Sequence, residues 1–313
     1  MKVLKFGGTS VANAQNILLV EKIVRKESSE NRVVVVVSAL SGVTDGLISA
    51  AESASAKNEN YSETIKTLEE KHLEFVKNLL PITEQSSWLS FVKKNFNDIE
   101  DICNGIYVLG EFTPRIKDKI TAYGEFLSSN IIAAKLKSDG LDCVWLDSRN
   151  YIKTNSNFTD AKVNFETTNA ALQTYFKENK QQITLAPGFI ASDVDGNITT
   201  LGRGGSDFTA SIIAAAVNAK ELQIWTDVSG MMTADPRLVS NAKIIHKISY
   251  QEAMELSHFG AKVIYPPTIQ PAIESGIPIE VKNTFNPQAP GTYIESSPPE
   301  TRGKIRGISG SSN

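Results

Sequence analysis

Residues Leu201–Ala210 read LGRGGSDFTA, and the rest of the chain is organised around this stretch. Three glycines surround Arg203, and Ser206 and Asp207 follow as candidate N-cap residues, which predicts a sharp turn before a helix. Such a turn leaves backbone N–H groups unpaired at the positive end of a helix, and together they attract an anion. The stretch therefore predicts an anion-binding loop between a strand and a helix.

A second loop of similar chemistry opens the chain, where the strand-like Val3 and Leu4 are followed by KFGGTS at Lys5–Ser10. Two glycine loops that each carry a cation favour one highly charged anion held between them. Each loop taken alone is equally compatible with an ordinary glycine turn.

Five consecutive valines at Val33–Val37 are typical of a parallel strand that is buried on both faces. The amphipathic stretch Ala14–Lys26 precedes them, so the N-terminal strand, this helix and the valine strand form a βαβ unit. We therefore expect an α/β fold, a three-layer αβα sandwich with a mostly parallel central sheet. Ser38–Asp45 follows the valine strand, at the sheet edge where such folds bind ligands, although a turn that caps the next helix is the alternative.

Residues from about 62 to 137 are expected to be helical. Glu125 lies within this region among apolar residues, so it either faces solvent or points inward at a cationic ligand. Later elements are expected as strands at Cys143–Leu146, Ile183–Leu185, Phe189–Ala191, Ile198–Leu201, Glu221–Thr226 and Ile277–Lys282, a hairpin turn at Asp193–Asn197, a helix at Tyr250–Phe259 and a turn at Gly260–Pro267.

The composition is typical of a soluble globular protein, and at 313 residues the chain can bury a large core. A net charge of −3 gives no electrostatic reason to bind nucleic acid, and no apolar run has membrane-spanning length. Cys103 and Cys143 lack metal-type spacing and are expected to be reduced thiols of a cytoplasmic protein. His72, His246 and His258 are scattered, so neither a histidine-dependent mechanism nor a protein metal site is expected.

The glycine spacing disfavours the common nucleotide-binding loops. Gly202, Gly204 and Gly205 give G-x-G-G, and the third glycine of a dinucleotide fingerprint falls on Asp207, whose charge would repel a pyrophosphate. The phosphate-loop pattern G-x-x-x-x-G-K-[ST] does not occur in the sequence. Asp207 suits a cation, whether a metal ion, a lysine or a substrate ammonium, and Arg203 suits a carboxylate. An ammonium partner beside a carboxylate partner indicates a site for an amino acid.

Five motifs occur in this order: KFGGTS at Lys5–Ser10, LGRGGSD at Leu201–Asp207, WTDV at Trp225–Val228, DPR at Asp235–Arg237 and SYQEAMELSHFGAKV at Ser249–Val263. Together they resemble the motifs of aspartokinases, in the amino-acid-kinase superfamily, and most of all the kinase part of bifunctional aspartokinase–homoserine dehydrogenases. The resemblance implies ATP-dependent phosphorylation of the side-chain carboxylate of L-aspartate to 4-phospho-L-aspartate. That reaction is the first step in the biosynthesis of lysine, threonine and methionine.

The resemblance also implies roles for individual residues. The implied catalytic residues are Lys5, at the transferring phosphate, and Asp207, which organises the lysine and the substrate. Aspartate is implied to bind at Ser38, Thr44, Glu125, Arg203 and Ser206, and the nucleotide at Lys5, Gly7, Gly8, Thr226, Asp227, Met232, Arg237, Lys262 and Val263. ATP and Mg²⁺ are the implied cofactors, with Mg²⁺ held mainly by the ATP phosphates. Met232 stands where the family has a tyrosine and Tyr265 where it usually has a histidine, so packing near the adenosine is expected to differ.

We expect a substrate lobe over residues 1–200, a nucleotide-binding lobe over 201–285, and a tail over 286–313 that leads into a regulatory domain. L-Aspartate and ATP are the expected partners, without nucleic acid or membrane, and the full-length protein is expected to be a homo-oligomer. No general base is expected, because the carboxylate of aspartate is already ionised at neutral pH. Two alternatives stay open, a kinase for another acceptor such as N-acetylglutamate or carbamate, and a catalytically idle scaffold.

Overall fold

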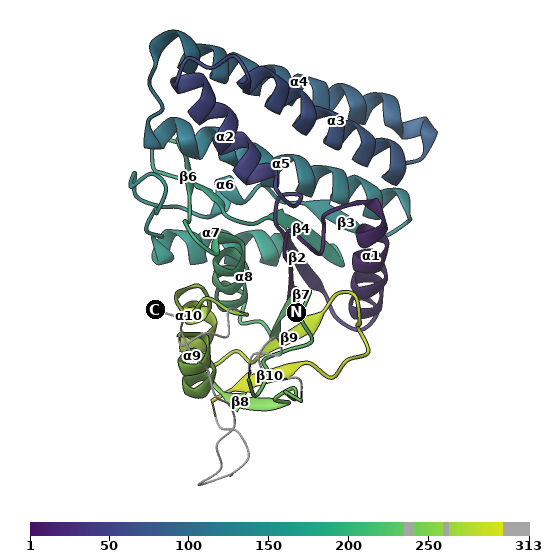
Figure 1. Cartoon of the computed structure of the whole chain (residues 1–313). Helices are drawn as coiled ribbons and strands as arrows, with labels where there is room; N and C mark the ends of the chain where they lie inside the picture. Colours follow the sequence, from purple (N-terminus) through teal and green to yellow (C-terminus); the bar gives the residue numbers. More distant parts are fainter. Residues whose placement is uncertain (235–238, 240, 259–262, 297–313) are drawn as a thin grey trace.

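The computed structural model describes residues 1–234, 239, 241–258 and 263–296 of the chain. Within them, eight strands form one sheet in the order β3-β4-β2-β1-β7-β9-β10-β8 (Figure 1). Every neighbouring pair is parallel except β9 and β10, which confirms the mostly parallel sheet. The strands of this sheet are β1 (Lys2–Phe6), β2 (Val33–Val37), β3 (Cys143–Trp145), β4 (Ile183–Pro187), β7 (Glu221–Thr226), β8 (Lys247–Ser249), β9 (Ile279–Asn283) and β10 (Thr292–Glu295).

Helices cover both faces of this sheet (Figure 1). One face packs against α1 (Ala14–Ser28), α2 (Val43–Ser55), α3 (Tyr61–Leu79), α4 (Ile82–Leu109) and α5 (Pro114–Ser138). The other packs against α7 (Phe165–Glu178), α8 (Gly205–Ala216), α9 (Tyr250–His258) and α10 (Pro266–Glu274). A short helix, α6 (Ser148–Tyr151), follows β3, and the predicted hairpin is formed by β5 (Ile190–Ser192) and β6 (Ile198–Thr200).

Alternate valines of β2 belong to two different hydrophobic cores. Val33, Val35 and Val37 lie in the core with α1–α5, whereas Val34 and Val36 lie in the core with α7–α10. Successive side chains of a strand point to opposite faces, so a strand between two cores has to be apolar at every position. The five valines therefore belong to the middle layer of the predicted αβα sandwich.

Some elements differ from the prediction. Phe165–Glu178 (α7) and Pro266–Glu274 (α10) are helices in regions where we predicted none, and the start of α10 falls within a predicted turn. Thr292–Glu295, in the predicted tail, is strand β10, which pairs with both β9 and β8. Tail residues 297–313 lie outside the described residues.

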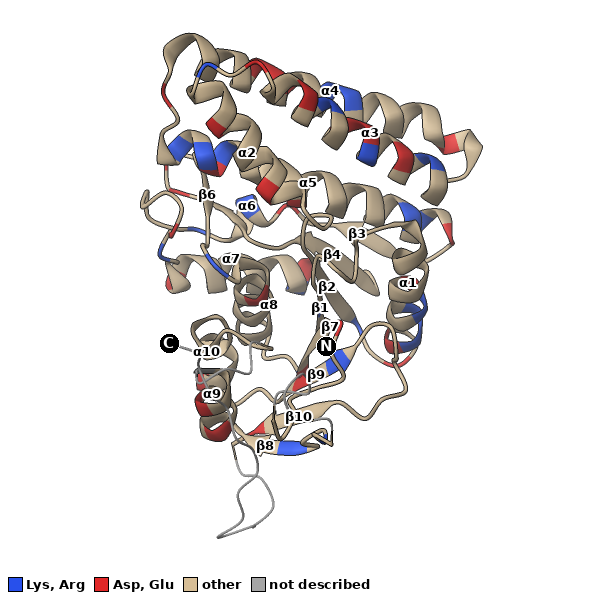
Figure 2. Cartoon of the chain, viewed as in Figure 1, with Lys and Arg blue, Asp and Glu red and all other residues tan. Residues whose placement is uncertain are grey.

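Charged side chains are frequent on the outer helices and absent from three neighbouring strands of the sheet. Figure 2 shows Lys, Arg, Asp and Glu interspersed along α3 and α4, while β2, β3 and β4 carry none of them. Because the two signs are mixed, these helices create no large field of a single sign. None of the helices in the described part of the chain is long and apolar enough to cross a bilayer.

Candidate active site

The two glycine loops lie at the same edge of the sheet because β1 and β7 are neighbours. In their parallel register Phe6 lies opposite Trp225, and the amide of Gly7 donates a hydrogen bond to the carbonyl oxygen of Trp225 at 3.3 Å. The second glycine loop leads into α8, which packs against both strands. The carboxyl ends of two parallel strands and the amino end of a helix therefore meet, an arrangement that binds ligands in many α/β proteins.

A cavity of about 250 Å³ is present at this edge. Its lining contains six residues that we predicted, Lys5, Ser38, Thr44, Glu125, Ser206 and Asp207, and also Phe189, Gly202, Gly204 and Gly205. These residues come from both glycine loops, from the segment after β2, from α2 and from α5. Segments that lie far apart in the sequence thus form one concave polar site.

Lys5 and Asp207 form an ion pair in the wall of this cavity. The Nζ atom of Lys5 lies 2.7 Å from Oδ1 of Asp207, and the two side chains are only 12% and 15% exposed. Apart from this ion pair, the oxygen has no hydrogen-bond partner among the described residues. Asp207 lies in the first turn of α8, where the helix dipole stabilises a negative charge. The pair therefore holds the ammonium of Lys5 beside the amino end of α8.

Glu125 is buried in the cavity wall, with 5% of the residue exposed. Burial raises the pKa of its carboxyl to about 8, and a hydrogen bond from the Ala39 backbone offsets only part of this effect. Its Oε2 atom is buried and has no hydrogen-bond partner among the described residues. A cation that binds beside this carboxyl lowers its pKa and is neutralised by it. Of the two orientations that the sequence left open, the structure shows the inward one.

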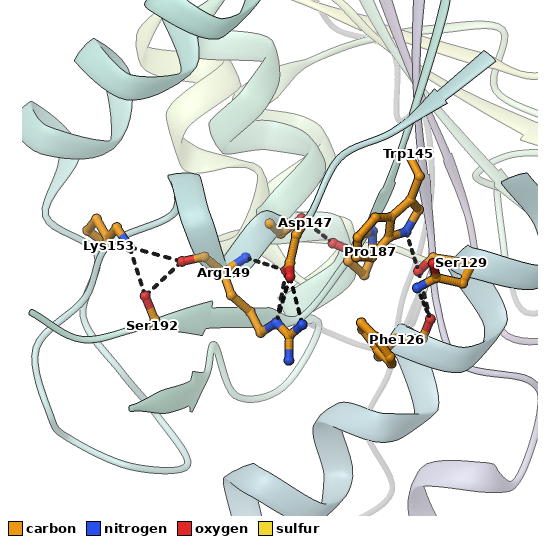
Figure 3. A network of polar contacts seen from close by, with 10 residues as sticks. Phe126, Ser129, Trp145, Asp147, Arg149, Lys153, Pro187 and Ser192 are labelled. Atoms are coloured by element: carbon orange, nitrogen blue, oxygen red, sulfur yellow. Dashed lines mark hydrogen bonds and ion pairs between the residues drawn. The ribbon is translucent and has the colours of Figure 1, made fainter. Parts of the chain in front are cut away.

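A polar network ties the helix that carries Glu125 to the end of β3 (Figure 3). The guanidinium of Arg149 donates to both oxygens of Asp147, with 2.8 Å from Nε to Oδ1 and 2.6 Å from Nη2 to Oδ2. Its central carbon lies 4.7 Å from the ring centroid of Phe126, the residue after Glu125. These contacts fix α5 against the segment that follows β3.

The amino end of α5 is tied to the second glycine loop by Asp118, which is 1% exposed. Its Oδ1 atom accepts from the hydroxyl of Thr200 at 2.6 Å, and Oδ2 accepts the backbone amides of Thr159 at 2.9 Å and Thr200 at 3.0 Å. Burial raises the pKa of this carboxyl, although the three hydrogen bonds act in the opposite direction. Thr200 directly precedes Leu201, so Asp118 fixes the spacing between α5 and the loop. No local sequence pattern indicates this role.

Arg203 does not line the cavity, unlike the other four residues implied to bind aspartate. Its side chain is exposed, and its guanidinium carbon lies 5.1 Å from the ring centroid of Tyr265. Gly202 and Gly204 on either side do line the cavity, each with φ of +71°, a backbone conformation that favours glycine. Arg203 therefore lies at the rim of the cavity.

The predicted nucleotide-binding residues of the two central strands lie at the same sheet edge. Thr226 ends β7, and its hydroxyl donates to the carboxylate of Asp227 at 3.2 Å. Gly7 and Gly8 follow β1, and a side-chain carbon at Gly8 would lie 3.3 Å from the carbonyl oxygen of Ala39. The absence of a side chain at Gly8 lets the loop after β1 approach the segment after β2 closely.

The remaining predicted nucleotide-binding residues follow β7 in the sequence. Met232 forms an isolated β-bridge with Ile244, and Val263 packs against the core of α7–α10. Arg237 and Lys262 lie outside the described residues.

Phe189 is a cavity residue that the sequence reasoning missed. Its φ is +65°, which is rare for a bulky side chain, and its backbone amide donates to the hydroxyl of Thr209 at 3.0 Å. A side-chain carbon at Gly205 would come 2.6 Å from the Phe189 ring, so only glycine fits there. The available signal was Gly188 followed by a bulky residue at the end of a buried strand.

The fold and the cavity define an α/β protein with a ligand site at the carboxyl ends of parallel strands. Residues 1–283 match the Amino acid kinase family, and the chain belongs to this family.

Several similar proteins carry aspartokinase names. The chain is 41% identical over 295 residues to bifunctional aspartokinase/homoserine dehydrogenase 1, chloroplastic, of Arabidopsis thaliana, covering 93% of this chain and 32% of that protein. It is 36% identical over 296 residues to the aspartokinase of Chlamydia pneumoniae, covering 93% of this chain and 62% of that protein. The chain thus spans about a third of the bifunctional relative and under two thirds of the second.

A solved structure is similar over almost the whole chain. E. coli aspartokinase III in complex with aspartate and ADP superimposes with a TM-score of 0.87 at 32% identity, covering 96% of this chain and 65% of that one.

Proposed function

We propose that this chain catalyses the ATP-dependent phosphorylation of the side-chain carboxylate of L-aspartate. One observation carries the proposal: a single cavity combines the Lys5–Asp207 ion pair with the buried carboxyl of Glu125. A kinase for an amino acid needs an anionic partner for the ammonium group and a cation for the transferring phosphate. The similarity to aspartokinase III, whose crystal structure contains aspartate and ADP, supports this choice of substrates.

In this proposal, the charges of the amino acid are divided between two sides of the site. Glu125 binds the ammonium group from the cavity wall, and Arg203 binds the α-carboxylate from the rim. The hydroxyl-bearing residues of the lining, Ser38, Thr44 and Ser206, complete the polar surround. The side-chain carboxylate of the substrate then points toward Lys5.

The chemical step needs electrostatic stabilisation rather than a base. An aspartate carboxylate is already ionised at neutral pH, so it attacks the γ-phosphorus directly and ADP leaves in line. The ammonium of Lys5 neutralises the charge that builds up on the transferring phosphoryl oxygens, and Asp207 fixes the position of that ammonium.

We also propose that one end of the sheet binds the amino acid and the other end binds ATP. The order of the strands supports this division, because β3, β4, β2 and β1 come from residues 1–200, and β7, β9, β10 and β8 from the remainder. The first group carries the amino-acid site, and ATP binds over the second, at residues such as Thr226 and Asp227 that follow β7.

The described residues contain no group of three or more His, Cys, Asp or Glu that could hold a metal ion. In the proposal, a Mg²⁺ ion would be carried on the phosphates of ATP, where it would neutralise phosphate charge. The place of the reaction at the start of lysine, threonine and methionine biosynthesis, and a homo-oligomeric full-length protein, belong to the same proposal and depend on the aspartokinase resemblance.

The test is acceptor-dependent release of ADP from ATP, measured with L-aspartate, N-acetylglutamate and carbamate in parallel. Hydroxylamine in a second assay traps an acyl phosphate as the hydroxamate, which separates carboxylate phosphorylation from simple ATP hydrolysis. We expect turnover and hydroxamate with L-aspartate. Turnover with another acceptor alone would assign a different amino-acid kinase, and no turnover with any acceptor would favour the idle scaffold.

A further inference from the structure

The guanidinium of Arg203 lies over the ring of Tyr265. The separation from the guanidinium carbon to the ring centroid is 5.1 Å. Within the described part of the chain, the side chain of Arg203 makes neither an ion pair nor a hydrogen bond. An exposed arginine between two glycines has large conformational freedom, and a contact with an aromatic ring reduces that freedom.

The ring of Tyr265 is attached to a rigid part of the backbone. Tyr265 is the N-cap of α10, and Pro266, which follows it, restricts it to extended conformations. Its carbonyl oxygen accepts from the amide of Thr268 at 3.0 Å and from the hydroxyl of Thr268 at 2.7 Å. A side-chain carbon at Gly204 would lie 2.8 Å from Thr268 and 3.5 Å from the Tyr265 ring. The start of α10 and the glycine loop are therefore packed together.

A guanidinium that lies over an aromatic ring can still donate its N–H groups to a carboxylate. Arg149 shows this arrangement complete, because its central carbon lies over the ring of Phe126 while its edge donates to both oxygens of Asp147 (Figure 3). Arg203 has the aromatic partner and lacks the carboxylate partner among the described residues. The carboxylate that would complete this arrangement at Arg203 would then come from a ligand rather than from a neighbouring side chain.

We infer that Tyr265 is a positioning residue that orders Arg203 for binding the α-carboxylate of the substrate. This inference rests on the proposed function, which assigns that carboxylate to Arg203. Because the ring orders the guanidinium before the substrate arrives, binding loses less conformational entropy. A cation–π contact at an exposed site corresponds to a factor of about two to five in an equilibrium constant.

Three variants test the inference kinetically. Tyr265→Leu removes the ring and should raise KM for aspartate by about two- to five-fold, with kcat close to that of the parent and a smaller change in KM for ATP. Tyr265→Phe keeps the ring and should retain the parental KM. Tyr107→Leu is the matched control, since it removes a similar contact with Lys57, 5.5 Å from Nζ to the ring centroid, outside the residues that line the cavity.

A double-variant cycle and a measurement of order complete the test. In an Arg203→Ala background, Tyr265→Leu should not raise KM further, whereas an additional rise would show that the ring acts by another route. A lower KM in Tyr265→Leu would show that the ring competes with the substrate for Arg203, and would overturn the inference.

The motion of the Arg203 Nε–H bond, measured by ¹⁵N relaxation without substrate, should increase in Tyr265→Leu and not in Tyr265→Phe. This readout does not depend on aspartate being the substrate. If L-aspartate were not the substrate, increased motion in Tyr265→Leu would still show that the ring orders Arg203. Failure of the proposed function and failure of this inference therefore give different results. Unchanged motion in Tyr265→Leu would refute the positioning role.

Discussion

Glu125→Gln should change ligand binding and stability in opposite directions. The carboxyl is buried, its Oε2 atom has no hydrogen-bond partner among the described residues, and burial raises its pKa to about 8. The amide has a similar shape but cannot ionise. The variant therefore removes both the cost of burying a charge and the negative partner of the substrate ammonium.

The pKa sets the size of the binding effect. With a value of about 8, roughly 1% of the carboxyl is ionised at pH 6 and roughly half at pH 8. If the substrate ammonium binds only the ionised form, the apparent affinity for aspartate rises about 50-fold between these pH values. In Glu125→Gln the affinity should be lower than in the parent at pH 8 and almost independent of pH over this range.

The same pKa sets the stability effect. A carboxyl whose pKa is raised on folding stabilises the folded state least at high pH, so stability falls as pH rises from about 4.5 to about 8. By pH 8 the cost is about 4 kcal/mol, an order-of-magnitude value at 1.36 kcal/mol per pKa unit. Glu125→Gln should therefore melt higher than the parent at pH 8, by roughly 6 °C for a chain of this length.

Aspartate titrations by calorimetry and melting curves at pH 6, 7 and 8 check both effects. Glu70→Gln is the control, because it makes the same chemical change on an exposed position of α3. An affinity for aspartate in the parent that stays flat between pH 6 and pH 8 would refute the ammonium-binding role. A Tm for Glu125→Gln that lies below the parental value at pH 8 would refute the cost assigned to the buried carboxyl.

Three further predictions follow from the described contacts. Lys5→Ala should lower kcat by about 10²–10³ with a smaller change in KM for aspartate, as steady-state kinetics can show; turnover within a few-fold of the parent would make Lys5 structural. Asp118→Ala leaves three donors unpaired, so it should destabilise the protein by about 2–4 kcal/mol and raise KM for aspartate. Asp118→Asn can still accept hydrogen bonds from both amides. It should therefore resemble the parent in Tm and KM. Burial lowers the pKa of His72 to about 4, so stability should fall as pH drops from about 6.5 to 4, by about 3 kcal/mol in total, and melting curves of His72→Phe should show a weaker acid dependence.

The site residues that could be predicted from the sequence lie at the ends of elements that a local pattern identifies. The ends of β1 and β2 carry Lys5 and Ser38, and both strands could be identified from their apolar residues alone. Parallel strands place their carboxyl ends at one edge, so naming the strands also placed these side chains together. The orientation of Glu125 could be assigned only from the structure, because periodicity alone could not distinguish the inward face of α5 from the solvated one.

The parts that the sequence did not predict depend on contacts between distant segments. Phe189 adopts a positive φ in the structure, beside Gly205 and the hydroxyl of Thr209, and none of these is adjacent to it in the chain. The contact of Arg203 with the ring of Tyr265 depends on the helix α10, whose first residues we predicted as a turn. Prolines at Pro266 and Pro267 were the available signal, since proline is favoured in the first turn of a helix.

The position of Lys5 explains why the reaction is expected at the middle of the sheet rather than within one lobe. β1 is the last strand of the first group and β7 the first strand of the second, and they are hydrogen-bonded neighbours. Lys5 extends from β1, while its partner Asp207 comes from the helix that leads into β7. An amino acid bound beside Glu125 and a nucleotide bound after β7 would therefore present their reacting groups to the same ammonium. A cation shared between two anions lowers their repulsion during in-line transfer, and this pair of strands positions one.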